Sequence, residues 1–430
     1  MSPTATPTAA LPGGLACQRD SSLRELTTLV HACDALDERF YELELLDTVL
    51  FPEGGGQPCD TGRINDAVVD KVYVKDGRCV HRVASGADGA APFMVGEQVH
   101  VIVDWARRFD HMQQHSGQHL LSAICEKYGY DTTTWSLGDE RCNIELVPFP
   151  SNEAAKQSKE KVVPAAILQQ IEADVNDAIV RGLAMKPQFL AKDAPEWEHV
   201  AGKFDEAQRP EVLRVVVIDG VDSNPCCGTH VLNIAQLQSL RILNTEYARG
   251  ATRVWFVVGG RVNREFARMF QREQQLTKLL SCAPDEHSSR IDKFLQFQRS
   301  ATKEIKALQK EAAVAIATEL LANSQQGDAN KTPVVHYHRK DADLSFLQNI
   351  LTSLGEAKAS TVFVLSAGDA RGEGSFVLAG PSALIQEHGK TVIEVIEGKG
   401  GGGKNGVLQG KAKKLGNVSA LIEQLQALQV

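Results

Sequence analysis

The stretch HSGQHLLSA, residues 115–123, places two histidines four residues apart in a segment of helix-compatible residues. Asp110 is a suitable N-cap and Gly129 a suitable end, so we expect a helix over residues 111–128. Side chains four residues apart project from one face of a helix, so His115 and His119 can bind the same metal ion. The alternative is a row of polar surface histidines, since His111 also lies four residues from His115.

A second pair with the same spacing lies in the stretch PCCGTH, residues 225–230, which we expect to form a turn between strands. Cys226 and His230 add one thiolate and a third imidazole to the two helical histidines. Zinc accepts both donor types and prefers a tetrahedral set, so the cofactor predicted for His115, His119, Cys226 and His230 is Zn²⁺. In the alternative, Cys227 or neither cysteine binds, and zinc only joins the two motifs.

A third motif, FPEGGGQ, occupies residues 51–57 and is followed by Asp60 and Gly62. Three successive glycines, Gly54, Gly55 and Gly56, allow positive φ or a close approach of the backbone to a ligand. Gln57 can donate and accept hydrogen bonds. The glycines are thus candidate substrate-binding residues, and a plain barrel loop is the simpler alternative.

The hydrophobic periodicity predicts an α+β protein with several domains. Alternating residues and an Asp76-Gly77 turn predict a β-barrel domain, and helices and strands mix after it. The expected divisions are a flexible N-terminus (1–20), the barrel domain (21–105), an α+β metal-binding domain (106–262), a helical hairpin with a linker (263–331) and a small α/β domain (332–430).

The overall composition narrows the classes of function. A net charge of −8 disfavours indiscriminate nucleic-acid binding, but a local basic stretch that includes Lys404 and Lys411 could still contact phosphates. The nine cysteines are an odd number, typical of a reducing compartment, so we expect a cytoplasmic protein. The chain lacks an apolar run of about 18 residues, so no membrane insertion is expected.

The three motifs, in this order, resemble the editing domain of alanyl-tRNA synthetase and its free-standing relatives, the alanyl-tRNA editing (AlaX) proteins. The family pattern of a Thr, Pro, Gly-Gly-Gln, Asp and Gly stretch matches residues 48–62, with Leu50-Phe51 where the family usually has Phe-Tyr. The start of the chain looks like the eukaryotic cytoplasmic long form. The glycine-rich C-terminal section resembles the DHH-associated domain of the synthetase.

The resemblance implies a zinc-dependent aminoacyl-tRNA deacylase. Its expected substrate is tRNA(Ala) mischarged with serine, with the glycyl ester as a second candidate. Gln57 and Gln118 are expected to position the ester or the terminal adenosine as catalytic residues. Ser136, which follows a tryptophan as a hydroxyl residue does in small family members, is expected to select serine by pairing with its hydroxyl. Whether zinc is catalytic or shapes the pocket stays open at this point.

Further contacts to tRNA are expected from basic residues. Arg108 suits the acceptor-stem phosphates because arginine makes bidentate contacts. Lys404 and Lys411 lie in the section that holds tRNA in the family. The predicted protein is a monomer or a dimer formed through the helical hairpin.

Three other functions are alternatives to this one. A complete synthetase needs an ATP-binding domain, for which the chain has no room ahead of the barrel. A DHH-type phosphoesterase needs aspartate-rich metal motifs, which are missing. A non-catalytic tRNA- or protein-binding module with structural zinc is the main alternative.

Overall fold

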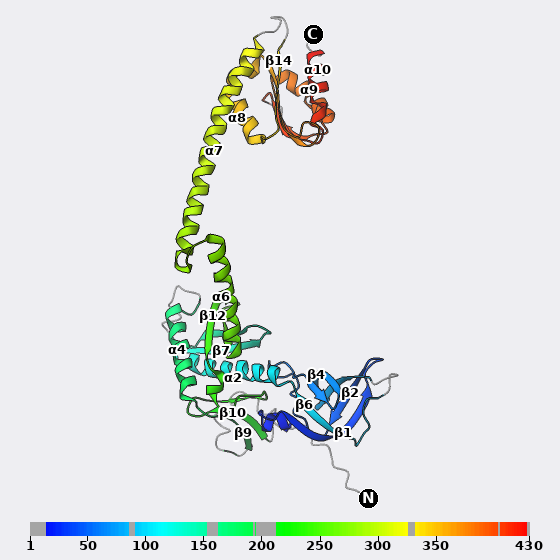
Figure 1. Cartoon of the computed structure of the whole chain (residues 1–430), viewed down its shortest axis with the longest axis vertical. Coiled ribbons are helices and arrows are strands. Elements are labelled where there is room, and N and C mark those ends of the chain that lie inside the picture. Colours follow the sequence, from blue (N-terminus) through cyan, green and yellow to red (C-terminus); the bar gives the residue numbers. More distant parts are fainter. Residues whose placement is uncertain are drawn as a thin grey trace. The chain divides into compact units, whose positions relative to one another are not determined.

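The computed structural model describes residues 14–85, 91–152, 162–191, 194, 212–325, 332–402 and 405–427. The chain divides into two compact units, Met1–Glu273 and Gln274–Val430. The first unit contains the predicted barrel and the predicted metal-binding section, and the second contains the C-terminal sheet (Figure 1). No helix in these described stretches is long and apolar enough to cross a membrane.

The predicted barrel is confirmed as a closed six-stranded barrel with strand order β1-β2-β5-β4-β3-β6. Its strands are β1 (Glu25–Ala35), β2 (Phe40–Leu45), β3 (Gly62–Ile64), β4 (Ala67–Lys75), β5 (Arg78–Ala84) and β6 (Gln98–Val103). Buried residues such as Leu43, Val69 and Val101 alternate with exposed ones, as a barrel requires. Asp76 and Gly77 both have positive φ, so the predicted tight turn joins β4 and β5.

The N-terminal segment differs from the prediction of a flexible stretch up to residue 20. Residues 14–20 are described, and helix α1 (Ala16–Arg19) lies within them. Ala16, Cys17 and Gln18 are buried, and the backbone N–H of Cys17 donates to the carbonyl oxygen of Thr48. Residues 16–18 therefore belong to the folded first unit, because their side chains pack into it.

The metal-binding section is an α+β arrangement built on two small sheets. The four-stranded sheet has the order β12-β13-β8-β7, and the three-stranded sheet has the order β11-β10-β9. The strands are β7 (Tyr130–Leu137), β8 (Cys142–Pro148), β9 (Met185–Ala191), β10 (Val212–Ile218), β11 (Asp222–Pro225), β12 (Leu240–Ala248) and β13 (Ala251–Val258). Helices α2 (Trp105–Lys127) and α4 (Ala165–Arg181) share one apolar core with them.

Helix α2 begins earlier than the sequence predicted. Its N-cap is Asp104, whose carboxylate accepts from the backbone N–H of Arg107, so Asp110 lies inside the helix. Asp110 instead forms ion pairs with Arg261 and Arg264. Both residues suit an N-cap, and the sequence pattern did not separate them. The predicted end is confirmed, since Gly129 has positive φ directly after the helix.

Two long helices lie in the section predicted as a helical hairpin, but in the described residues they do not pack along each other as an antiparallel hairpin would. Helix α6 (Gly260–Leu280) and helix α7 (His287–Ser324) are separated by the short helix η4 (Pro284–Glu286), which includes the predicted proline break. The hydroxyl of Thr277 lies 3.1 Å from Nε2 of His287 across this break.

The C-terminal unit contains a five-stranded sheet of order β14-β15-β16-β18-β17. Its strands are β14 (Val334–Arg339), β15 (Val362–Gly368), β16 (Gly374–Ala379), β17 (Lys399–Gly402) and β18 (Val407–Ala412), and its helices are α8 (Leu344–Leu354), α9 (Ser382–Val395) and α10 (Val418–Ala427). The predicted mixture of strands and helices in residues 332–430 is present as a mixed sheet with helices, in which β14 and β15 pair in parallel and the other described strand pairs are antiparallel.

Candidate metal centre

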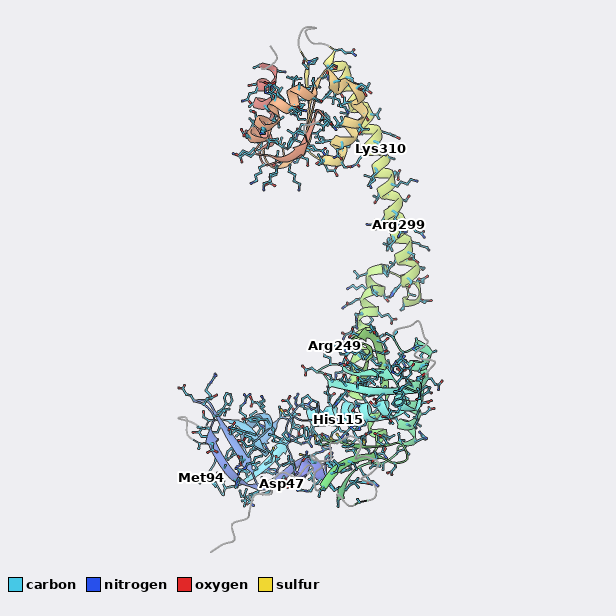
Figure 2. All side chains as sticks on the ribbon, turned by 180° about the vertical axis from the view of Figure 1, so that it is seen from behind. Asp47, Met94, His115, Arg249, Arg299 and Lys310 are labelled. Carbon is cyan, nitrogen blue, oxygen red and sulfur yellow. The ribbon has the colours of Figure 1, made fainter. Side chains whose placement is uncertain are left out.

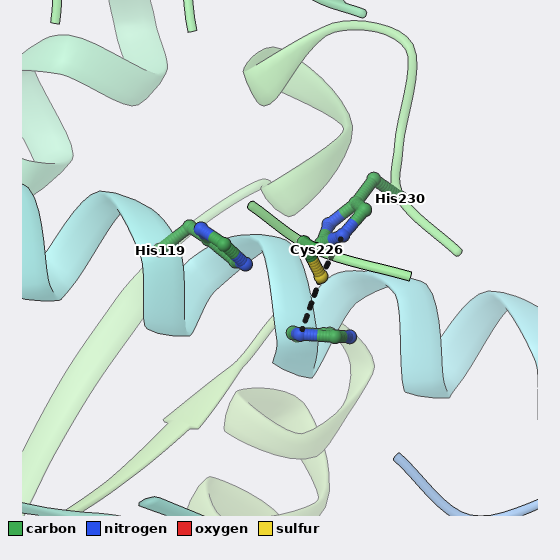
Figure 3. A group of neighbouring side chains, drawn as sticks. His119, Cys226 and His230 are labelled. Atoms are coloured by element: carbon green, nitrogen blue, oxygen red, sulfur yellow. Dashed lines mark hydrogen bonds between the residues drawn. The ribbon is translucent and has the colours of Figure 1, made fainter. Parts of the chain in front are cut away.

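The four predicted ligands lie together in the first unit. His115 and His119 project from α2, whereas Cys226 and His230 come from the loop after β11. One ligand atom from each of the four lies within 4.8 Å of the others. The Cys226 sulfur lies 3.4 Å from Nε2 of His115 and 3.2 Å from Nε2 of His230 (Figure 3). Residues more than 100 positions apart in the sequence thus form one N₃S donor set.

Burial and neighbouring charged groups shift the pKa values of these side chains. Burial lowers the pKa of His115 and lowers that of His230 to about 3, so both imidazoles are neutral at neutral pH. Burial alone would raise the pKa of the Cys226 thiol, but His115 and His230 hold it well below its usual range. Burial alone would lower the pKa of His119, but Asp222 and Cys226 raise it to about 9, so this imidazole releases a proton when a cation binds. Neutral imidazole and thiolate are the forms that coordinate metal, so the donor set fits a divalent ion such as Zn²⁺ after that proton is released.

Each histidine also meets a polar side chain through its outer nitrogen. Nδ1 of His115 lies 2.8 Å from Oε1 of Gln57, and Nδ1 of His230 lies 3.2 Å from the hydroxyl of Ser116. Nδ1 of His119 lies 3.8 Å from a carboxylate oxygen of Asp222. The Nε2 atoms of His115 and His230 therefore face the cluster, as metal-binding histidines with outer partners usually arrange themselves.

Residues that the sequence prediction missed hold the Cys226 loop in place. The guanidinium of buried Arg214 donates to the carbonyl oxygens of Cys226 and Gln18, and the Gln18 amide donates to the carbonyl oxygen of Cys227 at 3.0 Å. The backbone N–H of His230 donates to the hydroxyl of Ser21 at 3.2 Å. Helix α1 and the following turn thus fix the Cys226 loop, which no local sequence pattern indicates.

A pocket of about 330 Å³ opens on the cluster. Its lining includes ligand side chains, part of strand β7 and residues of α2: Gly55, His115, Gln118, His119, Ser122, Glu126, Asp131, Thr132, Thr133, Thr134, Trp135, Asn224, Pro225, Cys226 and Cys227. The Trp135 ring stacks on the His115 imidazole with 4.5 Å between centroids. The cluster therefore lies at the wall of a cavity that can admit a small group.

Of the predicted site residues Gln118 and Ser136, the first lines this pocket and the second does not. Gln118 lines it, and its amide donates to the Ser122 hydroxyl at 3.0 Å. Ser136 is exposed on β7 and is not among the lining residues, so its position does not suit a contact with a bound serine side chain. Thr132 lines the pocket instead, and its hydroxyl donates to Ser122 at 2.8 Å.

Comparisons with known proteins agree with this geometry. Residues 213–254, which include Cys226 and His230, match the family model described as the threonyl and alanyl tRNA synthetase second additional domain. The chain is 38% identical to the rat alanyl-tRNA editing protein Aarsd1, covering 96% of this chain and 98% of the relative. It is 39% identical to the mouse protein of the same name, covering 93% and 94%. A putative alanyl-tRNA editing protein alaX from yeast is 29% identical, covering 94% of each chain.

The chain belongs to the alanyl-tRNA editing protein family. The first unit contains both the barrel and the matched domain, and Figure 2 labels His115 to show where the candidate metal centre lies within it. The resemblance drawn from the three motifs is thereby confirmed.

The glycine motif of this editing-family chain forms a tight loop beside the centre. Gly55 and Gly56 have φ of +59° and +83°, which other residues rarely adopt. A Cβ atom on Gly56 would lie 2.8 Å from the Trp135 ring, and one on Gly55 would lie 3.1 Å from the Cys227 sulfur. Gly54 and Gln57 close the loop through two backbone hydrogen bonds. Gly55 lines the pocket, so its backbone is placed where a substrate could contact it. The contact itself stays a prediction.

Gln57 is fully buried behind His115, which differs from the predicted direct contact with substrate. Its amide group donates to the Thr229 hydroxyl, and its oxygen accepts from the Thr229 backbone N–H. The described contacts of Gln57 are thus with His115 and Thr229.

Arg108 does not lie where the sequence prediction placed it. Its side chain is 0% exposed and forms a buried ion pair with Asp60, and it also donates to the carbonyl oxygens of Val49 and Ser21. A guanidinium with these partners cannot reach a tRNA phosphate. It joins α2 to the barrel instead, because Asp60 and Val49 belong to barrel-domain loops.

The two predicted lysines belong to the C-terminal unit. Lys404 lies outside the described residues. Lys411 is exposed on β18 and lines a pocket of about 470 Å³ together with Lys399, Lys413, Glu373 and Glu397. The predicted basic surface is thus interrupted by two carboxylates.

Proposed function

We propose that this protein is a free-standing editing hydrolase that removes serine from mischarged tRNA(Ala), with the glycyl ester as a further substrate of the same class. The observation that carries the proposal is the N₃S cluster at the wall of the 330 Å³ pocket, in a chain of the alanyl-tRNA editing family. Hydrolysis of an aminoacyl ester requires an aligned water, stabilisation of charge at the carbonyl oxygen and placement of the terminal ribose.

The donor set fits a resident zinc ion held by His115, His119, Cys226 and His230. With all four protein ligands bound, zinc would shape the wall of the pocket, and with one ligand released it would supply a Lewis-acid centre there. Gln57 and Ser116 then keep the Nε2 atoms of His115 and His230 directed at the ion, because each meets the Nδ1 atom on the other side of the ring.

Selection of serine over alanine must depend on the one hydroxyl by which they differ. Gln118, Ser122 and Thr132 form a linked set of polar groups in the pocket, with hydrogen bonds of 3.0 and 2.8 Å. When Thr132 donates to Ser122, its own oxygen can accept a hydrogen bond from a substrate hydroxyl. A site built for that hydroxyl discriminates against alanine, which leaves a polar group unpaired. We therefore transfer the selector role predicted for Ser136 to Thr132.

Contacts to the body of the tRNA are proposed for the C-terminal unit. Lys399, Lys411 and Lys413 come together at one pocket and can meet phosphate oxygens. Lys404 is proposed as a further contact of the same kind. The cytoplasm is the proposed location.

The direct experiment measures deacylation of Ser-tRNA(Ala), Gly-tRNA(Ala) and Ala-tRNA(Ala) by the zinc-loaded protein. The wild type should hydrolyse the seryl ester much faster than the alanyl ester, and a His115→Ala/His119→Ala variant should lose both zinc and activity. Equal rates on the seryl and alanyl esters would contradict the selectivity. Binding of tRNA without hydrolysis of any ester would favour the alternative of a non-catalytic module with structural zinc.

A further inference from the structure

Asp222 lies beside the candidate metal centre in an unusual environment. It is the first residue of β11, four positions before Cys226, and its side chain is 10% exposed. One carboxylate oxygen, Oδ1, accepts a hydrogen bond of 2.6 Å from the side-chain amide of Asn224. The other, Oδ2, is buried and has no hydrogen-bond partner within the part of the chain that the structure describes. A buried carboxylate oxygen without a partner is costly, so its retention needs an explanation.

The partnerless oxygen of Asp222, Oδ2, is directed at a ring nitrogen of His119. Oδ2 lies 3.8 Å from Nδ1 of His119, and Asn224 holds the carboxylate from its other side. His115 and His230 meet Gln57 and Ser116 through their Nδ1 atoms. The three histidines of the cluster therefore share one arrangement, in which a polar group from another segment faces Nδ1.

Asp222 differs from the other two partners in charge. Gln57 offers an amide oxygen and Ser116 a hydroxyl, whereas Asp222 carries a full negative charge. A divalent ion with one thiolate and three neutral imidazoles would have a net charge of +1, which is costly to bury. A carboxylate one imidazole away compensates this charge without occupying a coordination position.

We propose that Asp222 is the positioning residue for His119, and that its carboxylate strengthens the binding of the divalent ion at the centre. This inference rests on the metal site proposed above and extends it to a residue outside the donor set. The carboxylate orients the imidazole so that Nε2 faces the ion, and it makes that nitrogen a better donor. Asp222 does not touch substrate in this account.

The test compares Asp222→Asn with wild type. Asparagine keeps the shape and the oxygen that accepts from Asn224, but it removes the charge. Asp219→Asn is the matched control, because Asp219 is an exposed carboxylate in the loop that precedes β11. Zinc affinity is measured at one pH by competition with a chromogenic chelator, and thermal melting is followed for metal-free and zinc-loaded protein.

We expect Asp222→Asn to bind zinc about 10–100-fold more weakly than wild type, while Asp219→Asn matches wild type. Metal-free Asp222→Asn should lose at most the modest stability of the 3.8 Å ion pair between Asp222 and His119. The zinc-loaded variant should melt at a lower temperature than zinc-loaded wild type at the same zinc concentration.

Three results would overturn the inference. The first is equal zinc affinity of Asp222→Asn and wild type. The second is a loss of stability in the metal-free variant that accounts for the weaker binding, since that would make the carboxylate a purely structural group. The third, failure of wild type to bind zinc at all, would remove the proposed metal site itself and is distinguished from the others by the wild-type titration.

Discussion

Gln57 and His115 form a hydrogen bond that connects the barrel domain to helix α2: Oε1 of Gln57 lies 2.8 Å from Nδ1 of His115. The same oxygen accepts from the backbone N–H of Thr229 at 3.0 Å, in the loop between Cys226 and His230. Because a carbonyl oxygen can only accept, His115 must carry its proton on Nδ1. Its Nε2 lone pair then faces the Cys226 sulfur and the rest of the donor set.

Replacing Gln57 by leucine should weaken zinc binding about 10–100-fold, because His115 loses the acceptor that fixes its proton and its orientation. Gln57→Glu keeps an acceptor oxygen and should retain more of the affinity. Chelator competition measures both values. Unchanged zinc affinity in Gln57→Leu would show that His115 does not need this partner.

The buried pair of Arg108 and Asp60 should contribute to stability and not to tRNA binding. Arg108→Met leaves a buried carboxylate without its cation and should lower the free energy of unfolding by about 3–5 kcal/mol. Urea unfolding measures this change. The exposed pair of Arg82 and Asp70 gives the control, since Asp70→Asn should cost at most about 1 kcal/mol. A fully stable Arg108→Met protein with weakened tRNA binding would instead support the contact predicted from the sequence.

His81 should make the barrel sensitive to acid. It is fully buried, with Thr48 and the carbonyl oxygen of Leu43 on its two ring nitrogens, and burial lowers its pKa from 6.5 to about 4. Since the folded state resists protonation, the stability from neutral His81 is complete above pH 6.5 and is lost progressively as the pH falls towards 4. The loss should reach about 3 kcal/mol.

Unfolding free energies between pH 7 and pH 4 check the role of His81. His81→Gln should be less stable at pH 7 but should show a shallower decline, whereas His100→Gln, which changes an exposed histidine of the same barrel, should keep the wild-type slope. An unaltered slope in His81→Gln would assign the acid sensitivity to other groups.

The selector role of Thr132 can be separated from that of Ser136. Thr132→Val removes the hydroxyl at nearly constant shape and should lower kcat/KM for Ser-tRNA(Ala) about 10-fold, with little change for the alanyl ester. Ser136→Ala should behave as wild type because that hydroxyl lies outside the pocket lining. The opposite pattern would restore Ser136 as the residue that recognises serine.

The sequence predicted what depends on local spacing. The barrel strands, the Asp76-Gly77 turn and the His115/His119 pair follow from periods of two and four residues, and each is present in the structure. The grouping with Cys226 and His230 came from donor chemistry and from the resemblance, because no short-range pattern connects residues more than 100 positions apart.

What the sequence missed depends on three-dimensional packing. Strand β7 has an irregularity in its pairing with β8 between Thr132 and Thr134, so strict alternation does not hold there and Ser136 falls outside the pocket. Arg108 was predicted to contact phosphates because the sequence does not show that Asp60 lies against it in the fold. The unpartnered oxygen of Asp222 depends on a strand pairing that residue types alone do not indicate.

X-ray absorption of the purified zinc-loaded protein, with elemental analysis of the same sample, tests the central claim most directly. The account predicts one zinc ion per chain, with one sulfur at about 2.3 Å and three nitrogens at about 2.0–2.1 Å. The Cys226→Ser variant should lose the sulfur shell, whereas Cys227→Ser should keep it. A protein that retains no zinc, or zinc whose spectrum contains no sulfur, would contradict the assignment of His115, His119, Cys226 and His230 as one metal centre.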